Sequence, residues 1–190
     1  MVLLVVLVAL AVAALVYLAG IYNGLVNLRE NVKVAWANID VLLKQRHDEL
    51  PKLVETCRRY MQFEQETLEK VMRARTAVSE ASAAGNVAAV GAGEQLLRSG
   101  MSRLFAVAES YPQLKSDETF RRLQSRITAM EESIADRREL YNEQVNLNNI
   151  RVHVLPDALI ASSFGFGTAR MLEFAAAEKA DVSIGALFNA

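Results

Sequence analysis

MVLLVVLVALAVAALVYLAGIY, residues 1–22, is an apolar stretch without a single charged side chain. About 20 apolar helical residues are enough to cross the ~30 Å hydrocarbon core of a bilayer. A cleaved signal peptide is the alternative, but it needs a basic N-terminal region that this stretch lacks. The stretch therefore predicts a transmembrane anchor over residues 1–22. Its expected lipid-facing and interfacial side chains include Leu3, Leu7, Leu10, Leu15, Tyr17 and Tyr22.

Two cations follow this stretch and none precedes it. Arg29 and Lys33 lie just beyond the span, with Glu30 between them. Because Lys and Arg accumulate on the cytoplasmic side of membrane spans, this asymmetry predicts a single-pass protein with its N-terminus outside and its body in the cytoplasm.

Behind the span, apolar residues recur at alternating spacings of three and four. This period is typical of helices that pack side by side at a shallow angle. It predicts a first helix from Leu25 to about Val78, with a kink or a restart at Pro51. The repeating positions are Leu25, Leu28, Val32, Ala35, Ile39, Leu42, Leu50, Val54, Cys57, Met61, Leu68, Val71 and Val78.

The next segments are separated by glycine and proline. Ser79–Gly93 is rich in small residues and is predicted to be a loop. A second helix is expected to carry Leu97–Tyr111 and to end at Pro112, and a third to run from a cap at Ser116 or Asp117 to about Val152, before Pro156. Whether Pro51 and Pro112 kink or reverse the chain stays open.

These segments together predict an all-α protein. The anchor is expected to precede an elongated antiparallel, up-and-down bundle of three to four coiled-coil-like helices over residues 23–153. An apolar segment and tail would occupy residues 154–190.

Several polar residues interrupt the apolar stripes. A buried charge is costly unless it is paired, so these residues should meet partners or lie at the rim of the bundle. The sharper hypothesis is that they set helix register or pair across copies, with Asp40 and Glu132 as possible partners of the arginines. The candidate seam residues are Arg46, Glu64, Arg75, Arg137 and Asn148.

The segment Leu155–Phe174 is apolar and contains three phenylalanines, Phe164, Phe166 and Phe174. It is expected either to cover one end of the bundle as a short helix or to lie in the membrane interface beside the anchor.

Composition argues against several functional classes. The formal net charge is −1 and no basic stripe is present, which argues against nucleic acid as a partner. The two histidines, His47 and His153, each stand alone, and Cys57 has no evident basic partner. No cofactor, metal site or catalytic set is therefore predicted, and the protein is expected not to be an enzyme.

Three motifs resemble signatures of the LemA family: YNGLVNLRENVKVAWANIDVLLKQRHDELPKLVET (22–56), AVAESYPQLKSDETFRRLQ (106–124) and ESIADRRELYNEQVNLNN (132–149). The resemblance covers roughly residues 20–175. It implies a bacterial membrane protein with a short outside N-terminus, a cytoplasmic helical bundle and no attached catalytic activity.

Two functions remain open on these grounds. The first is a scaffold that assembles laterally with copies of itself at the bacterial inner membrane. The alternative is an adaptor or regulator of another, unidentified envelope protein. Besides the lipid bilayer, the expected partners are therefore further copies of the chain or that envelope protein.

Overall fold

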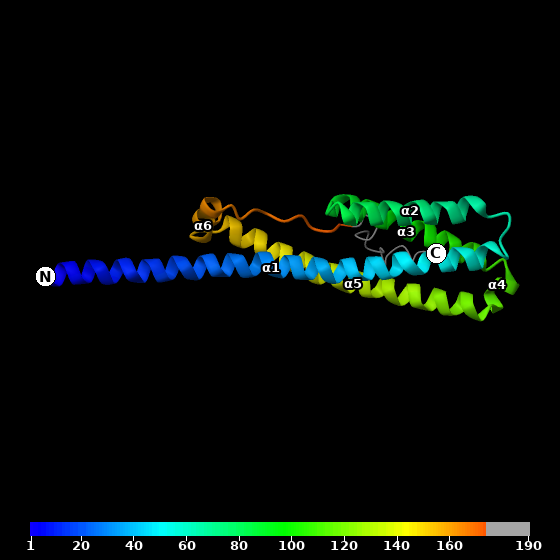
Figure 1. Cartoon of the computed structure of the whole chain (residues 1–190), viewed down its shortest axis with the longest axis horizontal. Coiled ribbons are helices and arrows are strands. Elements are labelled where there is room, and N and C mark those ends of the chain that lie inside the picture. The colour runs from blue at the N-terminus through cyan, green and yellow to red at the C-terminus, as the bar shows by residue number, and fades with distance from the viewer. Residues whose placement is uncertain (174–190) are drawn as a thin grey trace, which may run out of the picture. The chain divides into compact units, whose positions relative to one another are not determined.

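The computed structural model describes residues 1–173, which form six helices and no strand (Figure 1). The predicted all-α fold, with a long apolar N-terminal helix followed by a helical bundle, is confirmed. The helices are α1 (Val2–Arg58), α2 (Gln65–Ala83), α3 (Val87–Ala108), α4 (Pro112–Ser116), α5 (Glu118–His153) and α6 (Asp157–Phe164).

The chain divides into two compact units. Within the described residues, the first contains Met1–Leu42 and Glu132–Met171, and the second contains Leu43–Glu131 together with Leu172 and Glu173. The long helices α1 and α5 each contribute to both units.

In the second unit, α1 continues through Pro51 and ends at Arg58. A helical proline removes the N–H that would bond the carbonyl four residues earlier, here that of His47. The Arg75 side chain, on α2, donates to this carbonyl oxygen from Nε at 2.8 Å. Pro51 is therefore tolerated inside the helix because the carbonyl it leaves free has another donor.

The expected first helix from Leu25 to about Val78, kinked or restarted at Pro51, is wrong in extent, because the helix ends at Arg58 and a new one begins at Gln65. The N–H groups of Tyr60 and Met61 both donate to the Cys57 carbonyl, which closes the last turn of α1. The Met61 side chain is fully buried.

The predicted loop Ser79–Gly93 is also wrong in extent. The connection between α2 and α3 is a tight turn in which Gly85 has a φ of 63° and Asn86 caps α3 by accepting from the Ala89 N–H at 3.1 Å. Gly93 lies inside α3, where a Cβ would come within 2.9 Å of Val78 Cγ2. The small residues mark a close approach of two helices, which Figure 1 shows side by side, and not a loop.

Further along, α3 ends at Ala108, and Pro112 does not end a helix but begins the short α4. Asp117 then caps α5 as predicted, since its Oδ1 accepts from the Phe120 N–H at 2.9 Å. Tyr60 donates from its hydroxyl to Asp117 Oδ2 at 3.0 Å, which ties the end of α1 to this cap.

The core of the second unit consists of apolar side chains from every one of its helices, with Phe120, Leu123 and Ile127 contributed by α5. Fully buried members include Leu50, Leu53, Cys57, Met61, Val71, Val90, Leu104 and Leu114. In the first unit, α1 and α5 pack through buried Ile39, Ile134 and Val145, and the Trp36 and Tyr141 rings lie 5.4 Å apart.

Candidate functional sites

The apolar stretch at the start of α1 is not covered by protein. Residues 1–20 are all exposed, and Ile21 is the first buried side chain. Among the described residues, this is the one helix long and apolar enough to cross a membrane. The predicted anchor side chains Leu3, Leu7, Leu10, Leu15, Tyr17 and Tyr22 are exposed on it.

Where protein packing begins, α6 lies against α1. Ile21 and Leu25 form a buried cluster with Ala161 and Phe166. The Tyr22 ring meets Phe166 edge-on with 5.6 Å between centroids. This membrane-proximal cluster, defined as Ile21, Tyr22, Leu25, Ala161, Phe164 and Phe166, joins two predicted groups, the end of the span and the interfacial phenylalanines. Phe174, the third of these phenylalanines, lies outside the described residues.

Side-chain amides of α5 hold the segment that follows α6. Asn149 bonds both backbone groups of Ala169, accepting from its N–H at 2.8 Å and donating to its carbonyl at 2.9 Å. Buried Asn148 donates to the Gly167 carbonyl at 3.1 Å, and Tyr141 donates to the Arg170 carbonyl at 2.8 Å. Asn148 therefore helps to hold the extended segment of residues 167–170 against α5. The seam hypothesis did not include this role.

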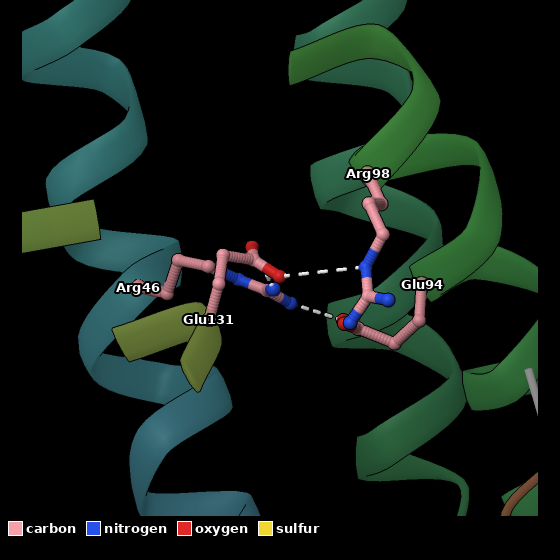
Figure 2. Close-up of polar contacts among 4 residues, drawn as sticks. All are labelled: Arg46, Glu94, Arg98 and Glu131. Carbon is pink, nitrogen blue, oxygen red and sulfur yellow. Dashed lines mark hydrogen bonds and ion pairs between the residues drawn. The ribbon is translucent and has the colours of Figure 1, made fainter. Parts of the chain in front are cut away.

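In the second unit, Arg46 is the centre of a buried charge cluster (Figure 2). Its side chain, on α1, is 1% exposed and donates to the carboxylates of Glu94 on α3 and Glu131 on α5. Arg98 Nε lies 3.9 Å from Glu131 Oε2. Two cations and two anions from three helices therefore meet in one place.

Burial and pairing act against each other in this charge cluster. Burial opposes the charge on Arg46, but the Glu94 and Glu131 carboxylates outweigh it and raise the pKa of Arg46. Burial also raises the pKa of the Glu94 carboxyl, an effect that Arg46 only partly offsets. Arg46 is thus a permanent cation whose removal would leave buried carboxylates without their main donor.

The sequence suggested Asp40 or Glu132 as partners for the arginines, whereas the structure assigns Glu94 and Glu131 to Arg46. A signal for Glu94 existed, because Glu94, Leu97 and Met101 are spaced by three and four on one stripe of α3. This signal was not used, because the predicted loop ends at Gly93 and the apolar stripe of the next helix was counted only from Leu97.

The other seam candidates have different surroundings. Arg75 is half-buried and bonds His47, through the carbonyl oxygen and through Nε2 at 2.6 Å. Because a guanidinium only donates, His47 Nε2 must accept, which assigns the neutral imidazole with its proton on Nδ1. Glu64 precedes α2 and lies on no helical seam, and Arg137 is exposed.

Among the described residues, no group of three His, Cys, Asp or Glu side chains is placed to hold a metal ion. Cys57 is fully buried, and this burial raises the pKa of its thiol to about 12. Burial and the Arg75 guanidinium lower the pKa of His47. Neither side chain has the features of an activated nucleophile or base.

Comparison with known proteins identifies the family of this chain. The model of the LemA family matches residues 35–185. The chain belongs to the LemA family. The match begins later than the first resembling motif and extends beyond residue 175, where the resemblance was expected to end.

Among curated proteins, this LemA-family chain is similar to magnetosome proteins. It is 25% identical over 175 residues to magnetosome protein MamQ 2 of Paramagnetospirillum magneticum, covering 80% of this chain and 64% of that protein. It is 23% identical over 168 residues to magnetosome protein MamQ of Magnetospirillum gryphiswaldense, covering 76% and 62%. The chain thus spans less than two thirds of the length of these relatives. Family and helical architecture together describe a membrane-associated helical protein.

Proposed function

We propose that this protein is a non-enzymatic scaffold, anchored by residues 1–22 in the bacterial inner membrane, that assembles laterally with copies of itself. The observation that carries the proposal is an exposed apolar stripe on the first unit. On α5, Leu140, Leu147 and Ile150 are each more than 40% exposed and are spaced by seven and three. On α1, Val34 and Val41 are more than half exposed and are also seven residues apart.

Exposed apolar residues at heptad spacing support pairing with another helix. A second copy anchored in the same bilayer presents the same stripe, and confinement to the membrane raises the effective concentration of such copies. A symmetric contact between like stripes needs no other partner.

The test is the mass of the full-length protein extracted in mild detergent. The wild type is expected to be a homo-oligomer, and the double variant Leu140→Glu/Leu147→Glu to be smaller. Leu96→Glu, which charges an even more exposed leucine on α3, is the control and should keep the wild-type mass. A sharply monodisperse wild-type monomer would refute the scaffold.

The proposed orientation places the N-terminus outside and the body in the cytoplasm. Arg29 and Lys33 support this orientation, because both are exposed cations just beyond the span. Both are paired with Glu30, but acidic residues contribute little to the positive-inside rule. Protease added to intact spheroplasts should leave the body undigested, and its digestion would reverse the orientation.

The adaptor alternative has its own observation in the second unit. A cavity of ≈ 720 Å³ beside the turn between α1 and α2 is lined by Met61, Phe63, Leu68 and Met72, and Phe63 is 93% exposed. If the protein is an adaptor, the Phe63→Ser variant should no longer copurify with a stoichiometric envelope-protein partner. The mass of its own oligomer should stay unchanged. Loss of no partner would leave this alternative without support.

A further inference from the structure

Helix α6 packs at the level where α1 emerges from the proposed span. Residues 1–20 are all exposed. At ~1.5 Å per helical residue they extend about 30 Å, which is the thickness of the hydrocarbon core. The next residues, Ile21 and Leu25, are the ones covered by Ala161 and Phe166. In Figure 1, α6 lies beside α1 in this region.

Large apolar side chains on α6, and just before it, are not covered by protein. Leu155 is 70% exposed, Leu159 63% and Phe164 61%. Leu155 and Leu159 are four residues apart, and the Phe164 ring also contacts Tyr22 with 5.1 Å between centroids. Three large exposed apolar side chains therefore lie on, or just before, the helix that packs beside the end of the span.

The two serine hydroxyls and the one carboxylate of this segment already have partners. The hydroxyls of Ser162 and Ser163 donate to the Leu159 carbonyl at 3.0 and 2.8 Å. Between Leu155 and Ala169 the one charged side chain is Asp157, which is paired with Arg151. The segment thus lacks an unpaired charge that would oppose entry into a region of low polarity.

A cation stands at the same level. Arg29 Cζ lies 5.1 Å from the centroid of the Phe166 ring, and its side chain is about half exposed. Its guanidinium can reach lipid phosphate while its stem remains on the aromatic ring.

We propose that α6 is a second membrane contact, in which Leu155, Leu159 and Phe164 lie in the lipid headgroup interface beside the emerging anchor. The occupant is lipid because exposed Phe164 packs on Tyr22, the last residue of the uncovered span, and so joins the exposed apolar side chains of α6 to it. The proposal rests on the membrane anchor of the proposed function, but not on self-assembly.

The test measures depth in the bilayer by tryptophan quenching. Trp36 is the single tryptophan of the chain and contacts Tyr141, so Trp36→Phe supplies a background that keeps the aromatic pair. In this background the full-length protein is made with Leu159→Trp, Leu140→Trp or Leu10→Trp. Each variant is reconstituted in phosphatidylcholine–phosphatidylglycerol vesicles whose acyl chains carry bromine near the headgroup or near the chain end.

Leu140 is the matched control because it is an exposed leucine of the same unit. It adjoins Tyr141, at the level of Trp36, about 20 Å further along α1 than Tyr22 at ~1.5 Å per residue. Leu10→Trp reports on the anchor itself. Far-UV circular dichroism checks that each variant keeps the wild-type helix content, and Phe164→Trp repeats the measurement at a second position of the face.

The expected result is stronger quenching of Leu159→Trp by shallow than by deep bromine, with blue-shifted emission. Leu10→Trp should be quenched more by deep bromine, and Leu140→Trp by neither. Blue-shifted emission of Leu159→Trp without quenching would place a protein surface, such as a second copy, on this face and overturn the proposal. Quenching no greater than that of Leu140→Trp would also overturn it. Loss of quenching in Leu10→Trp would instead refute the anchor.

Discussion

Replacing Arg46 with methionine is expected to lower the free energy of unfolding by about 3–5 kcal/mol, the usual cost of removing one partner from a buried ion pair. The side chains of Arg46 and Glu94 are 1% and 2% exposed, so Glu94 would lose its hydrogen-bonding cation without gaining water. The free-energy cost at Glu131 should be smaller, because its side chain is 20% exposed and Arg98 lies 3.9 Å from it.

A second substitution separates the cost of the orphaned charge from the value of the pair. Arg46→Met/Glu94→Met removes both buried charges and fills their volume with apolar atoms. Such exchanges are often neutral or stabilising, so the double variant should be more stable than Arg46→Met alone.

The stability deficit of Arg46→Met should depend on pH with a definite sign. Burial already raises the pKa of Glu94, and losing Arg46 removes a contribution that lowers it. A carboxyl whose folded-state pKa is raised costs nothing below its unfolded pKa and becomes costly as the pH rises through its folded pKa. The deficit should therefore be large at pH 7 and shrink as the pH falls toward the ordinary glutamate value of 4.5.

The assay is urea unfolding of the detergent-solubilised protein, followed by far-UV circular dichroism. A cost below about 1 kcal/mol for Arg46→Met, or a double variant whose loss equals the sum of the two single losses, would refute the assigned role of the charge cluster.

Three further predictions concern the second unit. Gly93→Ala should destabilise it by about 1–3 kcal/mol in thermal unfolding, because its Cβ would come within 2.9 Å of Val78 Cγ2; a neutral result would show that the helices separate freely. His47 has a lowered pKa, so its contribution is complete above the unfolded pKa of 6.5 and is lost as the pH falls through the folded value. His47→Gln, whose amide oxygen can still accept from Arg75, should flatten this acid-side decline, and an unchanged pH profile of stability would contradict the assignment. Cys57, with a pKa of about 12 and full burial, should resist maleimide at neutral pH until the protein is unfolded, and rapid labelling of the native protein would disagree.

Much of the helical pattern could be predicted from spacing alone. The stripe Leu97, Met101, Leu104 and Ala108 is buried on α3, and Asp117 caps α5. The helix boundaries were harder, because propensity does not distinguish a loop of small residues from a helix whose small residues permit close packing. Gly93 illustrates this, since its significance depends on the presence of Val78 opposite it.

The partners of the polar residues could not be predicted for a related reason. Pro51 predicted a kink or a restart; the helix runs through it without a restart, and Arg75 supplies a donor to the His47 carbonyl from another helix. Likewise, nothing in the sequence distinguishes Asn149 from other polar residues. Its role depends on the backbone of Ala169, whose N–H and carbonyl both hydrogen-bond its side-chain amide.

The sequence by itself determined the apolar length of the first 22 residues, the helical period behind them and the family motifs, because these depend on side chains close together along the chain. Only the tertiary structure decided that Arg46 meets Glu94 and Glu131, and that α6 lies where α1 emerges from its uncovered stretch. Such contacts join residues far apart in sequence, and their choice depends on the burial of the whole unit and not on any local preference.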